Sequence, residues 1–232
     1  MDMEQSNQSH WIPLADLMTG LMMVFMLLTA AFMLRVEQTT TLVVNEFEET
    51  KNDMLQALQK EFSRDLKQWN AELLGDMTIR FNDPTVLFAT GSSELKPKFK
   101  QMLREFFPRY VKMLTSDKYR EAIKEIRIEG HTSRSWTNST DTKTAYFLNM
   151  ELSQARTRSA LEFLLRLPSV ERQQDWLVSH VTANGLSSSR PISPSDNSAA
   201  AQLANQRVEF RIVTNASDRL DQIARELKAE QP

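Results

Sequence analysis

The sequence contains no cysteine, and this absence excludes disulfide frameworks and thiolate metal centres. A cysteine-free chain suits an oxidising compartment without requiring one. Glycine is also scarce, with five residues among 232. The three histidines, His10, His131 and His180, lie far apart and show no metal-ligand spacing. The sequence therefore predicts no metal site and no bound cofactor.

No long run of lysine or arginine is present, and the formal net charge is -2 at pH 7. Proteins that bind nucleic acid usually carry a concentrated basic patch, so we expect no direct nucleic-acid partner. The sequence also shows no nucleophile–base pair, no metal cluster and no phosphate-binding loop. We therefore expect no enzymatic activity.

One long apolar run lies near the N-terminus. The eighteen residues from Leu17 to Leu34 carry no charge, and Asp16 is the one charged side chain in residues 12–34. As a helix this run spans about 30 Å, the hydrocarbon thickness of a bilayer. A cleaved signal peptide needs a basic start, which the first eleven residues lack. We predict an N-terminal tail at 1–11 and a lipid-bilayer-spanning helix at 12–34, with a buried helix of a soluble core as the alternative.

Residues 35–75 are predicted to form a helical linker. Apolar residues recur there at helical spacing, at Phe47, Met54, Leu58, Phe62, Leu66, Trp69 and Leu73. This stripe favours equally a helix packed against its own domain and a short dimer-forming coiled coil. The β-branched run at 39–44 predicts a break in the helix, and Gly75 predicts its end.

Residues 76–215 are predicted to form one α+β domain. Alternating apolar residues predict strands at 77–81, 85–88, 123–130, 176–185 and 206–214. Helical spacing predicts helices at 91–114, ended or kinked at Pro108, and at 149–167. The Ser- and Pro-rich stretch at 186–202 predicts a loop, and residues 216–232 predict a charged terminal helix or tail.

Asp16 is the candidate functional residue of the apolar run. An ionised carboxylate at membrane depth costs roughly 2.5–3.5 kcal/mol, so Asp16 should face protein or water. Apolar surroundings favour the neutral form of a carboxyl group. We predict that Asp16 binds and releases protons as the coupling ion, with Na+ left open. The alternative is that Asp16 caps the helix at the level of the lipid headgroups.

The segment around Asp16 resembles the transmembrane helix of MotB, the B subunit of the flagellar stator. Trp11, Ala15, Asp16, Met18 and Thr19 occur in the order seen in that family. The resemblance implies a proton-carrying aspartate and a homodimer of this chain inside a ring of multi-pass A subunits.

The same resemblance implies a bacterial inner-membrane protein with a cytoplasmic N-terminus and a periplasmic C-terminal domain. The basic residues near the span point the other way, because Arg35 and Lys51 follow the apolar run and none precede it. We follow the resemblance, since a wall-binding domain must face the wall.

Four segments between residues 77 and 214 resemble the OmpA-like peptidoglycan-binding domain. They are LFATGSSELKP (87–97), IRIEGHT (126–132), NMELSQART (149–157) and NQRVEFRI (205–212). The fold implied is a single transmembrane α-helix plus an α+β OmpA-like (βαβαβ-type) periplasmic domain. The peptidoglycan-binding residues implied by these motifs are His131, Thr132, Asn149, Leu152, Arg156 and Arg207.

Cell-wall stem peptides carry carboxylates, which a guanidinium binds bidentately. We therefore expect Arg156, in the first turns of its helix, to bind the ligand, and Asn149 to cap that helix. Taken without the motif, Arg156 could equally be a solvated surface residue and His131 a structural residue at a strand end. Ser133 departs from the family, which usually has aspartate there to bind an amino group. Asp141 is a candidate substitute; otherwise binding is weaker or directed at another wall chemistry.

As a whole the chain resembles the B subunits of Zorya anti-phage systems, which pair with the A subunit ZorA. The resemblance implies a peptidoglycan-anchored subunit of a proton-driven, MotA/MotB-like motor acting in defence. A flagellar-type stator subunit and a passive anchor between membrane and cell wall are the alternatives.

Overall fold

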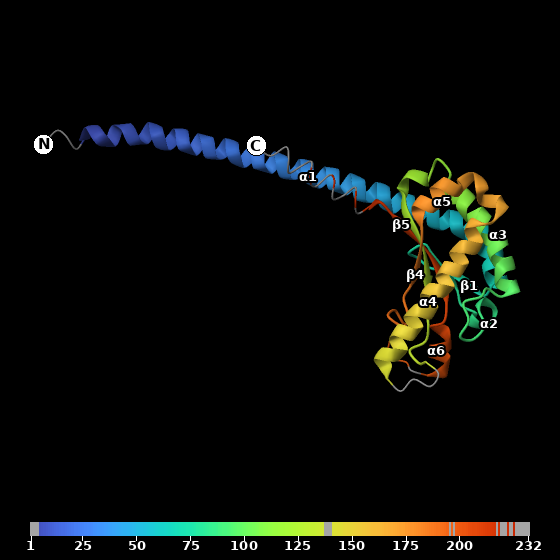
Figure 1. Cartoon of the computed structure of the whole chain (residues 1–232). Helices are drawn as coiled ribbons and strands as arrows, with labels where there is room; N and C mark the ends of the chain where they lie inside the picture. The colour runs from blue at the N-terminus through green and yellow to red at the C-terminus, as the bar shows by residue number, and fades with distance from the viewer. Residues whose placement is uncertain are drawn as a thin grey trace. The chain divides into compact units, whose positions relative to one another are not determined.

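A computed structural model describes residues 5–136, 141–194, 196 and 198–216, together with the single positions 218, 222 and 225 (Figure 1). The chain divides into two compact units, and residues 49–217 make up the larger. The smaller unit contains the chain up to residue 48 and the C-terminal tail. The predicted tail at 216–232 falls largely outside the described residues.

The first element is a 64-residue helix, α1 (Gln5–Gln68). Within it, Pro13–Gln38 has a mean hydropathy of 2.2 and no buried residue, and by length and composition it could cross a membrane. The predicted break at 39–44 is wrong, because α1 runs through that segment. β-Branched residues cost only about 0.5 kcal/mol each in a helix. Thr41 also satisfies its hydroxyl within the helix, donating to the carbonyl of Glu37 at 2.8 Å.

The last five turns of α1 belong to the core of the larger unit. Their apolar stripe is fully or almost fully buried at Met54, Leu58, Phe62 and Leu66, and Trp69, directly after the helix, is buried as well. The stripe packs against the rest of its own domain and is not available to a second chain. For these residues, the prediction of a helix packed against its own domain is confirmed and that of a coiled coil is wrong.

An ion-pair cluster fixes the polar side of this part of α1. Arg109 on α3 (Pro97–Leu114) places Nε 2.7 Å from Glu61 Oε1 and Nη1 2.7 Å from Asp65 Oδ2. Its Nη2 also donates to the Glu61 carbonyl at 2.7 Å.

The predicted helix end at Gly75 is wrong. The helix ends at Gln68, and Asn70 takes the left-handed conformation, with φ 51°, that turns the chain.

Five strands form one sheet in the order β1-β2-β5-β3-β4. They are β1 (Ala71–Leu73), β2 (Thr78–Phe81), β3 (Ile123–Gly130), β4 (Val181–Gly185) and β5 (Val208–Thr214). The β3–β4 pair is parallel, and the other pairs are antiparallel. Helices α3 and α4 (Thr142–Leu165) pack on the sheet, and Figure 1 shows α4 crossing it near β4. The predicted α+β architecture is confirmed.

The core is rich in aromatic rings from α1, α3 and the sheet. Phe106 of α3 lies at its centre, with ring centroids 5.3 Å from Phe62, 5.5 Å from Phe81 and 5.1 Å from Phe210. Offset and edge-to-face contacts at such distances add to the energy of apolar burial. This cluster joins elements that are distant in sequence and fixes where the sheet meets the helices.

One predicted strand is wrong, and another begins later than predicted. Residues 84–87 form a helical turn, α2 (Pro84–Leu87), because Asp83 caps it by accepting from the Thr85 amide at 3.0 Å and Pro84 suits its first position. Residues 176–180 belong to α5 (Gln174–His180), so the strand begins only at Val181. In both segments the spacing of the apolar residues fits a strand and a helix equally well.

Helix boundaries also differ from prediction. Helix α3 begins at Pro97 and continues through Pro108. Proline has no N–H to donate to the carbonyl of Arg104, four residues earlier, and the helix tolerates this loss because Arg104 is exposed to solvent. Helix α4 begins seven residues earlier than predicted, because Asp141 caps it. The predicted loop at 186–202 contains the start of the short helix α6 (Ala199–Ala204). The remaining elements are the 3-10 turns η1 (Arg120–Ala122) and η2 (Pro168–Gln173).

The substitution Phe62→Ala tests whether α1 belongs to the domain core. Phe62 is fully buried against Trp69 and Phe106, so its truncation should lower the free energy of unfolding by about 3–5 kcal/mol. Urea unfolding of the detergent-solubilised full chain, followed by tryptophan fluorescence, measures this change. Gln59→Ala, on the exposed side of the same helix, should have little effect. Equal stability of the two variants would contradict the packing of α1.

Candidate ligand-binding site

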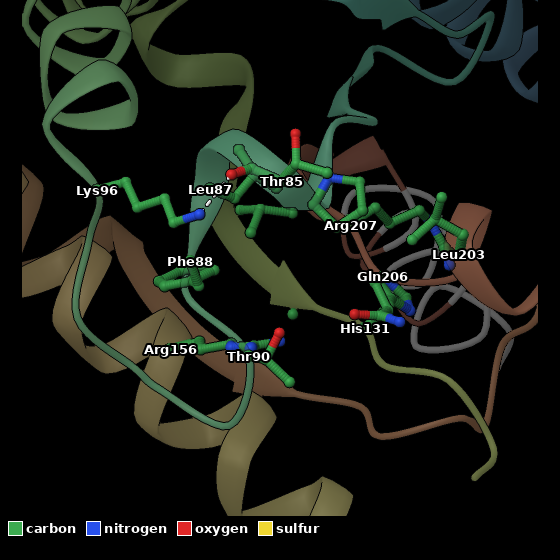
Figure 2. A pocket seen from close by; sticks show the side chains of 13 residues that line it. Thr85, Leu87, Phe88, Thr90, Lys96, His131, Arg156, Leu203, Gln206 and Arg207 are labelled. Atoms are coloured by element: carbon green, nitrogen blue, oxygen red, sulfur yellow. Dashed lines mark hydrogen bonds between the residues drawn. The ribbon is translucent and has the colours of Figure 1, made fainter. Parts of the chain in front are cut away.

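Two adjoining cavities lie where β3, α4, the 84–97 segment and the start of β5 meet. Cavity A has a volume of about 310 Å³ and is lined by Pro84, Thr85, Leu87, Phe88, Thr90, Lys96, Gly130, His131, Arg156, Leu203, Gln206, Arg207 and Val208 (Figure 2). Cavity B also has a volume of about 310 Å³ and is lined by Thr90, Gly91, Thr132, Ser133, Ser135, Trp136, Asn149, Leu152, Arg156 and Gln206. Thr90, Arg156 and Gln206 line both cavities.

The structure brings together all six residues that the sequence motifs singled out for peptidoglycan binding. His131 and Arg207 line cavity A, whereas Thr132, Asn149 and Leu152 line cavity B. Arg156 lies at the junction of the two cavities. The role of these residues stays a prediction, but their assembly into one site is a property of the fold.

A close approach of α4 to the end of β3 builds the junction. A Cβ atom on Gly130 would lie 2.7 Å from Thr157 Cγ2 and 2.9 Å from the Ser153 carbonyl, so a side chain there would push α4 away. Beyond Gly130, the amide of His131 donates to the Arg207 carbonyl at 3.0 Å, and that of Thr132 to the Ser187 carbonyl at 2.9 Å. These bonds fix the two side chains that enter the cavities.

Arg156 is buried, with 9% of its surface exposed, and no carboxylate among the described residues pairs with it. Its Nε donates to the Ser92 carbonyl at 2.9 Å, and its Nη2 to the Ala89 carbonyl at 3.2 Å. The guanidinium carbon lies 4.9 Å from the centre of the Phe88 ring, a cation–π contact visible in Figure 2. Burial lowers the pKa of Arg156 from its ordinary value. Because guanidinium stays protonated in proteins, Arg156 is a buried cation without a counter-ion in the described chain.

Two expectations about the α4 motif are wrong. Arg156 is in the fourth turn of α4, too far from the N-terminus for the helix amides to act on its ligand. Asn149 does not cap the helix; its side-chain amide donates to the Ser135 carbonyl at 3.2 Å and fixes the loop that borders cavity B. The cap is Asp141, which accepts from the amides of Lys143 and Thr144.

Arg207 is the opposite of Arg156, because its charge is compensated inside the chain. Its Nε lies 2.7 Å from Glu209 Oε1, and Arg80 Nε lies 2.6 Å from the same oxygen. Burial would raise the pKa of the Glu209 carboxyl, but His131 and the guanidinium of Arg207 outweigh it and hold the pKa well below its usual range. Arg207 is thus held in place by a fixed anion.

His131 lies behind cavity A between two buried carboxylates. Its Nε2 is 3.3 Å from Glu209 Oε2 and 3.9 Å from Glu129 Oε2, close enough for attraction but aligned for no hydrogen bond. Burial lowers the pKa of His131 despite Glu209, and the charge of Arg207 lowers it further. The imidazole therefore favours its neutral form.

Glu129, His131 and Glu209 place ligand-type atoms within 4.8 Å of one another, the geometry of a possible metal site. The charges disfavour this use. Arg80 and Arg207 pair with Glu209, and Arg190 Nη1 lies 3.5 Å from Glu129 Oε2. Because guanidinium groups already compensate both carboxylates, a divalent cation would add uncompensated positive charge. We interpret the cluster as a structural charge network.

Sequence reasoning missed Thr90, Lys96 and Gln206, which line the cavities. Nothing in their spacing distinguishes them from ordinary surface residues. Asp141, considered as a substitute for an aspartate at position 133, does not line either cavity and is engaged as the α4 cap. Asp16 lies on α1, four residues into the apolar segment, with its side chain exposed within the single chain.

Comparison with known proteins places the two cavities in a known class of domain. The model of the OmpA family matches residues 87–206, the part of the chain that contains most of their lining. The chain thus carries an OmpA-family domain. It is also 43% identical over 227 residues to the Zorya protein ZorB of Escherichia coli, covering 96% of this chain and 95% of that protein. The chain belongs to the ZorB family.

The fold is similar to that of a solved MotB domain. The periplasmic domain of Helicobacter pylori MotB matches 70% of this chain and 99% of its own, with a TM-score of 0.50 and 18% identity. The cell wall anchor of the T6SS from Pseudomonas aeruginosa matches 68% of this chain and 96% of its own, with a TM-score of 0.48 and 21% identity.

The buried His131 predicts a pH dependence of stability. Its folded pKa lies below the unfolded value of about 6.5, so the unfolded state gains a proton first as pH falls. The free energy of unfolding should therefore decrease as pH falls below about 6.5 and level off once the folded-state pKa is passed. Urea unfolding at several pH values should show a smaller decrease for His131→Gln than for the unmodified protein. Identical pH profiles would contradict the neutral, buried imidazole.

Proposed function

We propose that this protein is the peptidoglycan-anchored B subunit of a proton-driven, MotA/MotB-like motor in the bacterial inner membrane, acting in anti-phage defence with ZorA. The proposal joins two sites on one chain. Cavities A and B bind the cell wall, and Asp16 couples ion movement to the motion of partner subunits. Neither step requires catalysis by this chain.

The observation that carries the wall-binding part is the unpaired Arg156. A buried charge is costly unless an opposite charge compensates it, and Arg156 has none among the described residues. A carboxylate of a wall peptide entering either cavity would supply that charge. Neutral groups that line the junction, such as Thr90 and Gln206, can bind the peptide's polar groups.

The substitution Arg156→Ala should weaken binding to purified peptidoglycan by roughly 10–100-fold, because a charge-assisted hydrogen bond contributes about 1.5–3 kcal/mol. Co-sedimentation of the detergent-solubilised full chain over a range of peptidoglycan concentrations measures the change. Arg156→Lys should bind with intermediate affinity, since lysine keeps the charge but not the two-pronged geometry.

Arg158→Ala is the matched control, because Arg158 is an exposed arginine on the same helix. It should bind peptidoglycan as the unmodified chain does. Urea unfolding of each variant separates loss of binding from loss of folding. A folded Arg156→Ala variant with unchanged affinity would show that the site lies elsewhere.

The motor part of the proposal depends on Asp16. The apolar segment of α1 carries this one carboxylate between residues 12 and 34. Acidic side chains inside membrane spans face other protein or water and often serve proton transfer. We propose that Asp16 faces ZorA-type subunits arranged around a homodimer of this chain, and that each proton bound and released there drives a step of the ring.

This arrangement has a defined orientation. The OmpA-family domain lies in the periplasm, where it reaches the wall, and the N-terminus lies in the cytoplasm. A passive anchor without ion flux is the alternative function. Because Asp16 is the one ionisable side chain in residues 12–34, a substitution at this position distinguishes the motor from the anchor. Similarity to the Zorya protein ZorB favours defence over flagellar motility.

Asp16→Asn should abolish protection against phage while the protein still assembles with its A subunit. Asparagine keeps the size of the side chain but cannot take up and release a proton. Plaque assays, with co-purification of the A subunit as the assembly readout, measure both effects. Asp16→Glu keeps the carboxyl group and should retain part of the activity. Full protection by Asp16→Asn would leave the passive anchor as the function.

A further inference from the structure

The charges that line cavities A and B all have one sign. Cavity A contains three cationic side chains, Lys96, Arg156 and Arg207, and cavity B contains one, Arg156. Neither cavity has an aspartate or glutamate among its described lining residues. The ligand is therefore recognised by anion-binding groups and by neutral hydrogen-bonding groups.

The two buried carboxylates near the site, those of Glu129 and Glu209, are engaged elsewhere. Glu209 is paired with Arg80 and Arg207, and Glu129 lies behind His131 and near Arg190. Both glutamates are almost fully buried, so a ligand in the cavities does not reach them.

Two aspartates that border this region in sequence act as helix caps. Asp83 accepts from Thr85 at the start of α2, and Asp141 accepts from Lys143 and Thr144 at the start of α4. Neither lines a cavity. A positively charged group of a ligand would therefore find no counter-ion in the described part of the site and would be repelled by Arg156.

The neutral lining is suited to an anion and an uncharged peptide backbone. Thr132 Oγ1 is buried and has no hydrogen-bond partner in the described structure, although Thr132 lines cavity B. An unsatisfied buried hydroxyl is unfavourable, and a ligand oxygen or amide would satisfy it. Ser133, half-exposed beside it, contributes a hydroxyl and no charge.

We propose that the site selects a wall peptide that presents a carboxylate with no ammonium group beside it, and that Ser133 makes this selection. This rests on the proposed wall-binding function and names its ligand class. Arg156 binds the carboxylate, Thr132 adds a hydrogen bond, and the missing negative charge at position 133 leaves a neighbouring ammonium group uncompensated. An amidated, acylated or cross-linked amine fits the site, whereas a free zwitterionic end does not.

Two matched synthetic stem peptides test this selection. Both are tripeptides that end in diaminopimelate, with the N-terminus blocked and every carboxyl group amidated except the one beside the side-chain amine. In one peptide that amine is free, and in the other it is acetylated. Isothermal titration of the full chain in detergent measures both affinities. The unmodified protein should bind the acetylated peptide more tightly than the peptide with the free amine.

Ser133→Asp should reverse the preference by roughly tenfold in favour of the free amine, or about 1.4 kcal/mol, because the new carboxylate attracts the ammonium group. Ser133→Asn introduces a side chain of the same size as aspartate but without its charge, and it should keep the preference for the acetylated peptide. Position 133 is half-exposed, so neither change should prevent folding.

The outcomes separate this inference from the proposed function. If the unmodified protein binds the free-amine peptide as tightly as the acetylated one, or more tightly, and Arg156→Ala abolishes that binding, wall binding stands and the selection is wrong. If the unmodified protein binds neither peptide nor peptidoglycan, both proposals are wrong. An unchanged preference in Ser133→Asp would show that another residue makes the selection.

Discussion

The site of this protein depends on a buried guanidinium that the described chain does not neutralise. Arg156 is held by two backbone carbonyls and an aromatic face, which orient it without cancelling its charge. Arg207, in the same cavity, is neutralised by Glu209. The fold thus separates a structural arginine from one that is free to attract an anion, although both belong to motifs of the same family. In the proposed function, the affinity for a carboxylate follows from that difference, because a bound carboxylate would offset the cost of burying the charge of Arg156.

Close packing makes this arrangement possible. Gly130 lets α4 approach the end of β3, so that a residue from the fourth turn of the helix meets residues from the strand end. The aromatic cluster around Phe106 holds the sheet and helices in register behind the site. The end of α1 contributes Phe62 to this same core, and Trp69 follows directly after the helix. The single helix α1 thus carries Asp16 near its start and part of the core of the OmpA-family domain at its end.

The sequence was sufficient for several elements of the fold. The strands β2, β3 and β5 were predicted because their residues alternate between apolar and polar positions over a short length. Prediction failed at 85–87 and 176–180, where short apolar runs fit both a strand and a helix. The capping by Asp83 decided the first case. It also failed at 39–44, because the small local penalty of threonine and valine does not interrupt a long helix.

By itself, the sequence determined the apolar segment with its single carboxylate, the family motifs and six of the residues that line the cavities. These are properties of composition and order, which the chain carries whether or not it is folded. Only the tertiary structure decided that Arg156 lacks a counter-ion while Arg207 has one, that Asp141 caps a helix, and that Thr90, Lys96 and Gln206 complete the cavities. Burial and charge pairing depend on contacts between distant segments, and those contacts exist only once the chain has packed.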